Sequence, residues 1–443
     1  MRAAPMIELD RTHGGDAISW VATASSGGDF PLQNLPFAEF RRRGNGEAFR
    51  GGVAIGDSVL DLAAISRTGV LSGVAAEAAR ACAAPQLNAF LAMGRPAWRA
   101  LRQALFDLLH SDAASSIRKA ARNCLVPQSD VEYDLPACIG DYTDFYTSID
   151  HATNIGRLFR PDAPVAPNFQ WIPLGYHGRV SSIGLSGQTV RRPTGQSLPD
   201  GAAEPTIGPS TRLDYELELG IYIGQGNEQG EPIALDQAEE HIFGMCLLND
   251  WSARDIQRWE STPLGPFLAK NFATTVSPWI VTMDALAPFR APWPRSAGAP
   301  EPLAYLDTER TRASGAVDIR LEVWLETALH RQAGTAGERL STTSFRHQYW
   351  TPAQMVTHHT IGGCNLRSGD LLGSGTISGP GAGEAGALIE LSESGRRPVR
   401  LANGEERGFL HNGDAITLTG WCEKPGFARI GFGACRGIVA AAR

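Results

Sequence analysis

The chain has 443 residues, which corresponds to two or three domains at about 150 residues per domain. Hydrophobic residues make up 43% and charged residues 20% of it, a globular balance that excludes wholesale disorder. The formal net charge is −7 and no basic run of the nucleic-acid-binding kind is present, so we expect no nucleic-acid partner.

Cysteine usage and the N-terminus indicate a cytoplasmic protein. The seven cysteines are scattered without a CxxC pair, which is typical of reduced thiols rather than of a zinc site or a disulfide framework. The N-terminal sequence MRAAPMIELDRTHGG meets Asp and His before the apolar core of a secretory signal can form. No apolar run approaches the ~20 residues that span a bilayer, so we expect no membrane association.

Residues 1–128 are predicted to form a separate N-terminal unit. In residues 52–62, GVAIGDSVLDL, a glycine turn lies between two apolar runs, which predicts a pair of strands. The Ala- and Leu-rich stretch 75–121 has the spacing of amphipathic helices. The segment 126–136, with a proline at each end and acids between, is the predicted linker.

Residues 129–443 are predicted to form a larger, mainly β unit folded into a roll or barrel. Short apolar runs there are closed by turn residues, and several alternate apolar and polar residues as half-buried strands do. The runs are LDYELELGIYIG (213–224), IALDQAEEHIFGMCLLNDW (233–251), SPWIVTMDAL (277–286), VDIRLEVWLE (317–326), ALIELSE (387–393) and DAITLTGW (414–421).

Four carboxylates form the first candidate site. Glu216 and Glu218 are two residues apart, so on a strand both point to one face. Asp250 closes a long apolar run, and Asp144 lies in the aromatic stretch DYTDFY. Four such groups brought together need a cation, and oxygen ligands favour Ca²⁺ or Mg²⁺. The alternative is a solvated strand face with two capping aspartates.

Other candidates could move protons or stabilise negative charge. His151 has a side chain whose ordinary pKa, ~6.5, suits proton transfer, although a lone histidine is more often structural. Arg254, Gln257 and Lys270 could direct donors at an oxyanion, or form surface ion pairs. The glycine-rich run GDLLGSGTISGPG could bring backbone N–H groups and the Thr376 hydroxyl to a ligand carboxylate.

Several long motifs keep one order and near-identical spacing with a known family. The motifs in the larger unit are GDYTDFYTSIDHATNIGRLFR (140–160), GYHGRVSSI (175–183), LDYELELG (213–220), HIFGMCLLNDWSARDIQRWE (241–260), PLGPFLAKNFATT (263–275), GCNLRSGDLLGSGTISG (363–379) and ALIEL (387–391). FPLQNLPF (30–37) and GVAIGD (52–57) add to them. By these motifs the sequence resembles the fumarylacetoacetate hydrolase family.

The resemblance assigns roles to individual positions of this sequence. Metal-binding carboxylates are matched by Asp144, Glu216, Glu218 and Asp250, and a magnesium site also by Lys270 and Thr274. The general base is matched by His151 and the acid that orients it by Glu390. Oxyanion and leaving-group positions are matched by Arg254, Gln257 and Lys270. Substrate contacts are matched by Tyr146, Arg160, Tyr176, Gln257 and Thr376.

The resemblance also implies a fold, a reaction and an assembly. The expected fold is a small SH3-like N-terminal barrel followed by a β-roll, assembled as a homodimer. The expected reaction is hydrolysis of the C–C bond of 4-fumarylacetoacetate to fumarate and acetoacetate, the last step of tyrosine and phenylalanine degradation, with Mg²⁺ and/or Ca²⁺. Alternatives are a related acylpyruvate hydrolase, a decarboxylase or isomerase of aromatic catabolism, and a catalytically silent binding protein.

Two positions depart from the family pattern. Ser261 stands where members of the family carry a tyrosine that contacts the substrate. We therefore expect a contact with the carboxylate end of the substrate to differ in this protein. Glu39 stands where a small hydrophobic residue is usual.

Overall fold

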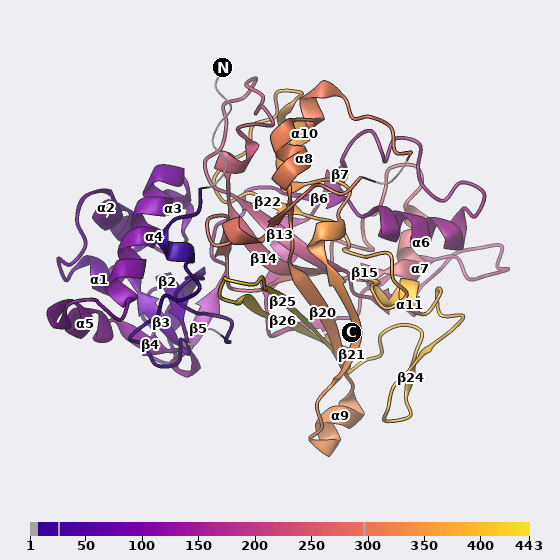
Figure 1. The fold of residues 1–443 in the computed structure, drawn as a ribbon. Coiled ribbons are helices and arrows are strands. Elements are labelled where there is room, and N and C mark those ends of the chain that lie inside the picture. The colour runs from indigo at the N-terminus through magenta and orange to yellow at the C-terminus, as the bar shows by residue number, and fades with distance from the viewer. Residues whose placement is uncertain (1–7, 25–26, 296–297) are drawn as a thin grey trace.

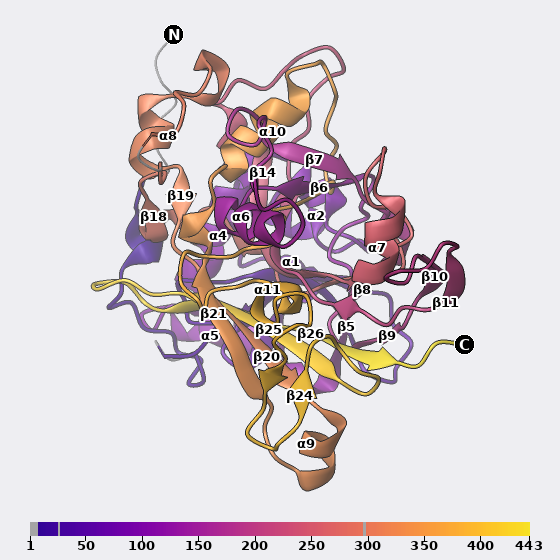
Figure 2. The same cartoon turned by 90° about the vertical axis from the view of Figure 1, so that its right-hand side faces the viewer.

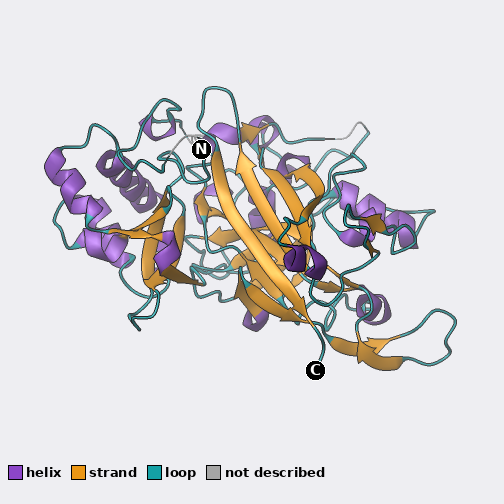
Figure 3. Cartoon of the chain, turned by 90° about the horizontal axis from the view of Figure 1, so that it is seen from below, coloured by secondary structure: helices purple, strands orange, loops and turns teal. Residues whose placement is uncertain are grey.

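The computed structural model describes residues 8–24, 27–295 and 298–443, drawn in Figure 1. Residues 1–7, which begin the predicted N-terminal unit and the segment on which the prediction of no secretory signal rests, lie outside the described residues. Within the described ranges, no helix has the length and apolar character needed to cross a bilayer. Strands are concentrated in the centre of the larger unit and helices lie around it (Figure 3), which confirms the predicted mainly β fold with some helix.

The N-terminal unit stands to one side of the larger unit (Figure 1) and contains an antiparallel sheet of five strands in the order β4-β3-β2-β1-β5. The strands are β1 (Phe37–Arg42), β2 (Arg50–Ile55), β3 (Ser58–Asp61), β4 (Leu125–Pro127) and β5 (Val131–Asp134). The helices around the sheet are α1 (Leu62–Ser66), α2 (Gly73–Ala81), α3 (Asn88–Leu91), α4 (Arg95–Leu109) and α5 (Ser115–Arg122). The predicted strand pair at 52–62 and the helical stretch 75–121 are confirmed.

The prediction that residues 126–136 form a linker is wrong. It contributes most of β4 and all of β5 to the N-terminal sheet, where β5 pairs with β1 and β4 with β3. The predicted boundary after residue 128 therefore falls between two strands of one sheet. The proline and acidic residues mark edge strands, where an unpaired N–H is tolerated.

The larger unit is built on two sheets with the main core between them. The first runs β7-β6-β22-β13-β14-β16-β8, with β17 also paired to β14. Its strands are β6 (Tyr142–Tyr146), β7 (Leu174–His177), β8 (Ile183–Leu185), β13 (Leu217–Ile223), β14 (Ile242–Asp250), β16 (Thr274–Val276), β17 (Val281–Thr282) and β22 (Leu371–Gly373). The second runs β21-β20-β25-β26-β9. Its strands are β9 (Gln188–Arg191), β20 (Arg320–Glu326), β21 (Glu338–Ser344), β25 (Ala415–Cys422) and β26 (Ile430–Ala440).

Smaller elements complete the unit. Two-stranded pairs are β10 (Thr194–Ser197) with β11 (Thr206–Pro209), β12 (Leu213–Asp214) with β15 (Ser252–Ala253), β18 (Arg290–Ala291) with β19 (Ala316–Val317), and β23 (Val399–Arg400) with β24 (Glu406–Arg407). The helices are α6 (Ile149–Phe159), α7 (Arg254–Glu260), α8 (Glu309–Ser314), α9 (Ala328–Ala333), α10 (Pro352–Thr360) and α11 (Leu388–Leu391). Short 3₁₀ turns in the larger unit occupy Val180–Ser182, Ala238–His241, Ala287–Phe289, Ala304–Leu306 and Phe345–His347. The N-terminal unit has two more, Arg11–His13 and Gln128–Asp130.

Most of the predicted strands are confirmed, with three exceptions. In the run 277–286 only Val281–Thr282 forms a strand, β17. The apolar run 387–393 forms the short helix α11 instead of a strand. The first part of the run 233–251 is a loop ending in a 3₁₀ turn, and the strand β14 begins only at Ile242.

One face of the first sheet changes character along its strands. Toward the N-terminal unit it is apolar and joins a core shared by both units, and toward the other end it is acidic. Because side chains on one face recur every second residue, each of three strands carries an apolar and an acidic member of that face. The pairs are Tyr142 and Asp144 on β6, Tyr222 and Glu218 on β13, and Leu248 and Asp250 on β14.

Aromatic packing fixes the N-terminal unit on that sheet. The Phe243 ring lies 5.4 Å from Phe37, 5.5 Å from Phe90 and 5.2 Å from Trp98, measured between centroids. Such edge-to-face pairs contribute about 0.5–1.5 kcal/mol each beyond their burial. The N-terminal unit therefore holds the apolar end of the strands whose other end carries the acids.

Glu39, the unusual residue of β1, is buried and incompletely bonded. Its Oε1 accepts the Gln86 N–H at 2.7 Å, while Oε2 has no partner among the described residues. Burial, with the Asp134 carboxylate nearby, raises the pKa of Glu39 to about 7 despite that hydrogen bond. The ionised form therefore destabilises the fold, and stability falls as pH rises from the ordinary value of 4.5 through about 7.

We expect Glu39→Gln to be more stable than the parent above pH 7, by up to about 3 kcal/mol, and near parity at pH 4.5. Urea unfolding from pH 4.5 to 8.5 measures this difference. Glu132→Gln on β5 is the control, because Glu132 is half-exposed and bonded to Arg41. Identical pH profiles for Glu39→Gln and the parent would contradict the prediction.

Candidate active site

Three carboxylates meet on the acidic end of the first sheet. Asp144, Glu218 and Asp250, all buried, each place an oxygen within 4.8 Å of the others. Gly373 on β22 lies between β6 and β13, opposite Asp144 and adjacent to Gly220. A Cβ atom there would lie 2.6 Å from Asp144 Oδ1 and 3.1 Å from Glu218 Oε2. The glycine thus leaves the space in which the oxygens converge.

Two oxygens of the convergent carboxylates lack compensating donors. Asp144 Oδ1 and Glu218 Oε1 have no hydrogen-bond partner within the described part of the chain. Burial, followed by repulsion from neighbouring carboxylates, raises the pKa of Asp144 and of Glu218 well above their ordinary values. Burial raises the pKa of Asp250 too, although Lys270 opposes it. Orphaned oxygens in an oxygen-only cluster are the environment that Mg²⁺ or Ca²⁺ compensates, so these residues fit a divalent cation.

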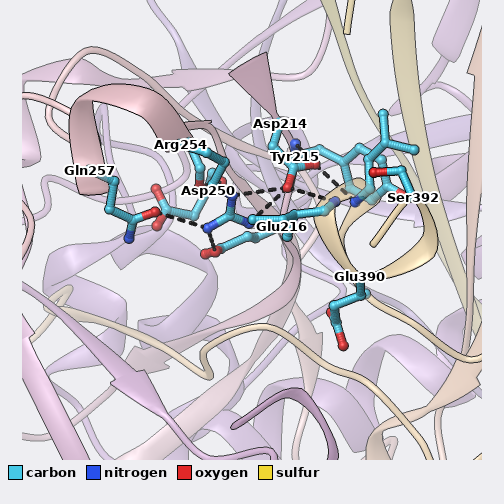
Figure 4. A network of polar contacts seen from close by, with 12 residues as sticks. Asp214, Tyr215, Glu216, Asp250, Arg254, Gln257, Glu390 and Ser392 are labelled. Atoms are coloured by element: carbon cyan, nitrogen blue, oxygen red, sulfur yellow. Dashed lines mark hydrogen bonds and ion pairs between the residues drawn. The ribbon is translucent and has the colours of Figure 1, made fainter. Parts of the chain in front are cut away.

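Glu216, the fourth predicted ligand, lies outside this cluster. Its Oε1 accepts from Arg254 Nη1 at 2.7 Å and its Oε2 accepts from Lys270 Nζ at 2.5 Å. These two cations outweigh burial and lower the pKa of Glu216. Figure 4 shows Glu216 beside Arg254 and Asp250. Both oxygens of Glu216 are used by cationic side chains, so its role as a ligand stays a prediction.

Lys270 connects Glu216 to the carboxylate cluster. Its ammonium also donates to Asp250 Oδ2 at 2.6 Å. Burial would lower the pKa of Lys270, but the two carboxylates raise it above its ordinary value. A protonated lysine has no lone pair, so Lys270 neutralises the site but does not coordinate a metal in this state. Thr274 is buried on β16 opposite Asp250, at the edge of the acidic surface.

His151 and Glu390 form a buried pair. His151 lies in the first turn of α6, where the Ser148 hydroxyl caps the helix by accepting the His151 N–H. Its Nδ1 lies 2.7 Å from Glu390 Oε1, and the side chains are only 4% and 1% exposed. Burial raises the pKa of Glu390, but His151, Asn154 and Ser378 together bring it below its ordinary value. An ionised carboxylate only accepts, so His151 carries its proton on Nδ1 and leaves Nε2 as an acceptor.

One cavity of about 740 Å³ is bordered by His151 and by Asp144, Glu216, Glu218, Arg254 and Lys270. Asp250 and Glu390 lie behind this lining, bonded to Lys270 and His151. The predicted substrate residues line it too, namely Tyr146, Arg160, Tyr176, Gln257 and Thr376. Tyr176 donates to Asp250 Oδ2 at 3.3 Å, and the exposed Arg160 ends α6 at the rim. Ser261 also lines the cavity, with its hydroxyl turned to the Gln257 carbonyl at 2.6 Å. The elements α6, α7 and α11 around it lie away from the N-terminal unit (Figure 1, Figure 2).

Comparisons with known proteins agree with this arrangement. A family model described as fumarylacetoacetase N-terminal matches residues 33–136, and one described as fumarylacetoacetate (FAA) hydrolase C-terminal matches residues 141–440. The chain is 48% identical over 418 residues to the fumarylacetoacetase of Oryza sativa subsp. japonica, covering 93% of this chain and 95% of that one. The chain belongs to the fumarylacetoacetate hydrolase family. The fumarylacetoacetase of Homo sapiens is 47% identical over 418 residues, covering 93% and 96%.

Among solved structures, the fumarylacetoacetate hydrolase from Exiguobacterium antarcticum aligns with 92% of this chain and 100% of its own. The identity is 16% and the TM-score 0.47, too distant a likeness to inform the site.

Three polar residues that contact the site were not among the site residues predicted from the sequence. Asn154 donates to Glu390 Oε2 at 2.8 Å, and Ser378 donates to both Glu390 oxygens at 2.9 and 3.0 Å. Asp214 accepts from Arg254 Nε at 2.9 Å. Asp214 stands two residues before Glu216 in the alternating motif LDYELELG, so the same period that singled out Glu216 could have found it.

Proposed function

We propose that the protein hydrolyses the C–C bond of 4-fumarylacetoacetate, giving fumarate and acetoacetate. The observation that carries the proposal is one cavity that joins a buried histidine–carboxylate pair to a convergent acidic cluster. The first supplies a general base and the second can hold a divalent cation. Overall, one water is consumed and one C–C bond is broken.

His151 and Glu390 activate the water. Nε2 of His151 takes the proton as the water oxygen adds to the carbonyl next to the fumaryl group, and Glu390 stabilises the imidazolium that forms. The C–C bond then breaks, and the electron pair leaves on the acetoacetate carbon as an enolate. Lys270, an ammonium held at 2.6 Å from Asp250, is the proposed proton donor to that carbon.

Asp144, Glu218 and Asp250 would hold Mg²⁺ or Ca²⁺. Such a cation acts as a Lewis acid that stabilises negative charge on the diketone oxygens.

Gln257 is oriented to meet the oxyanion. Arg254 Nη1 donates to Gln257 Oε1 at 3.1 Å, and arginine has no acceptor, so the amide must turn its oxygen to Arg254. The Gln257 NH₂ group is then left as the donor toward the cavity. Arg254 Nε and Nη1 donate to Asp214 and Glu216, while Nη2, 2.9 Å from Asp214 Oδ2, makes no hydrogen bond within the described residues. Arg254 therefore fixes Gln257 and lines the cavity itself.

Arg160, with Tyr146 and Tyr176, is the proposed recognition element for a substrate carboxylate. We expect Arg160→Met to raise KM about 30-fold and to change kcat less than about threefold, because a charge-assisted contact made equally in ground and transition states is lost. Steady-state kinetics measures the two constants. Arg157→Met on the exposed side of α6 is the matched control. An unchanged KM would remove Arg160 from substrate binding.

The test of the function is ultraviolet absorbance of 4-fumarylacetoacetate with purified protein, before chelation, after it, and after return of Mg²⁺ or Ca²⁺. We expect the diketone signal to decay, to persist with chelator and to decay again with metal. No decay with folded protein under any metal condition would contradict the proposal, and the same assay with acylpyruvates would then test the alternative hydrolase.

We also propose that the protein is a cytoplasmic homodimer. All seven cysteines, each within the described residues, are free, which suits a reducing compartment. Leu264 and Phe267, in the loop after α7, are 94% and 66% exposed, and such apolar exposure favours a protein contact. Light scattering coupled to size exclusion tests the dimer, and a monomer at micromolar concentration would contradict it.

A further inference from the structure

Asp214, at the end of β12, is a fully buried carboxylate that binds two parts of the site at once. Oδ2 accepts from Arg254 Nε at 2.9 Å and from the Ile389 N–H at 3.1 Å. Oδ1 accepts the Leu388 N–H at 2.9 Å and the Tyr215 N–H at 2.8 Å. One carboxylate thus joins the arginine of α7 to the first residues of α11.

The helix α11 depends on this contact for its start. It has four residues, and its N-cap, Ala387, offers no side-chain acceptor. Helix starts leave N–H groups without partners, and a helix this short does not form on its own. The Asp214 carboxylate supplies the missing cap from a distant strand, and its negative charge suits a helix N-terminus.

Glu390 is the next residue of α11 after Ile389. The cap therefore sets the place of the carboxylate that holds His151, while the same group holds Arg254 and through it Gln257. Figure 4 shows Asp214 beside Arg254, with Glu390 on the neighbouring segment. We infer that Asp214 is a positioning residue that fixes the His151–Glu390 pair relative to Arg254. The kinetic part of this inference rests on the proposed hydrolysis.

Asp214→Asn removes this double contact at constant volume. An amide offers one accepting oxygen and one donating NH₂. Either Arg254 and the Ile389 N–H, or the Leu388 and Tyr215 N–H groups, then face a donor. We expect kcat to fall about 100-fold, the effect of a displacement near 1 Å in a catalytic group, with KM changed less than about threefold.

Asp414→Asn is the matched control. Asp414 is buried and accepts from Arg407 Nε at 2.8 Å, from Arg407 Nη2 at 3.0 Å and from the His411 N–H at 2.8 Å. It is therefore the same kind of Asp–Arg–backbone contact, and it does not line the cavity. We expect this variant to lose thermal stability but to keep kcat.

The low-field proton NMR signal of the His151 Nδ1–H, bonded to Glu390, gives a readout independent of activity. It is assigned by its loss in His151→Gln. We expect the signal to persist in Asp414→Asn and to shift or disappear in Asp214→Asn. Adding Ala387→Ser to Asp214→Asn supplies a local cap for α11, and we expect the double variant to recover part of the signal. If Asp214→Asn alone folds poorly, the double variant still tests the inference.

Wild-type kcat or an unmoved signal in Asp214→Asn would overturn the inference, as would equal losses in Asp414→Asn. A parent protein inactive on 4-fumarylacetoacetate would refute the proposed function instead, and the NMR comparison of the two variants would then decide the role of Asp214 alone.

Discussion

Replacing His151 with alanine is expected to lower kcat about 1,000-fold, within the range that a general base contributes. The ring is the group of the cavity whose Nε2 is directed to act as an acceptor, because Nδ1 is held by Glu390 at 2.7 Å. Metal binding should be unaffected, because the carboxylate cluster belongs to β6, β13 and β14 and not to α6. Stopped-flow absorbance measures the chemical step, and calorimetric titration with Mg²⁺ or Ca²⁺ measures the metal site.

His330→Ala is the matched control for this variant. His330 is also buried, and its Nε2 lies 3.2 Å from the Glu338 carboxylate, while Nδ1 accepts the Thr327 N–H in a helix cap. Its loss should lower the melting temperature and leave kcat within about twofold, as for a substitution away from the reacting groups. Near-normal turnover in His151→Ala would remove His151 as the base, whatever the control does.

The acidic surface could be predicted because strand geometry is local. A period of two places Glu216 and Glu218 on one face of any strand, and the apolar run that ends in Asp250 marks a buried neighbour. The strand period does not predict which basic side chain neutralises which carboxylate. Glu216 turns to Arg254 and Lys270 because α7 and the loop after it return over the end of β13, and only the tertiary fold fixes that return.

The failures have a similar cause. ALIELSE has the apolar content of a strand, yet residues 388–391 form a helix because a carboxylate 174 residues away holds the first N–H. The segment 126–136 has the prolines of a linker, yet residues 131–134 pair with β1, about 90 residues earlier in the chain. Short segments have weak preferences of their own, so distant partners decide their structure.

Glu218→Gln is expected to change the stability of the protein in opposite directions with and without metal. In the metal-free protein, Glu218 Oε1 and Asp144 Oδ1 are buried oxygens without a partner among the described residues, and the two carboxylates belong to one cluster. The glutamine keeps an oxygen for the Gly375 N–H, bonded to Oε2 at 3.1 Å, and places an uncharged NH₂ group where the partnerless Oε1 stood. Removing one charge and one orphaned acceptor should stabilise this state by about 2 kcal/mol.

With metal the order should reverse. The parent gains stability from a ligand that binds only the folded state, about 2.7 kcal/mol at a concentration 100 times Kd, whereas the variant lacks one anionic ligand and gains less. Differential scanning calorimetry in EDTA and in excess Ca²⁺ or Mg²⁺ measures both orders. Glu322→Gln is the control, because Glu322 is bonded to Arg339 at 2.8 Å and to Trp324 at 3.0 Å, and its two melting temperatures should move in parallel with those of the parent.

Gly373→Ala reduces the space between the carboxylates without changing their charge, so it tests the two contributions to the metal site separately. The added Cβ atom would lie 2.6 Å from Asp144 Oδ1, so the three carboxylates remain but the oxygens must part. We therefore expect this variant to lose the metal-induced rise in melting temperature without the gain in EDTA that Glu218→Gln shows. If Glu218→Gln and the parent melt alike in EDTA, the carboxylates are not under mutual strain. If both variants keep the full metal-induced rise, the cation binds elsewhere, and the acidic cluster is not the metal site.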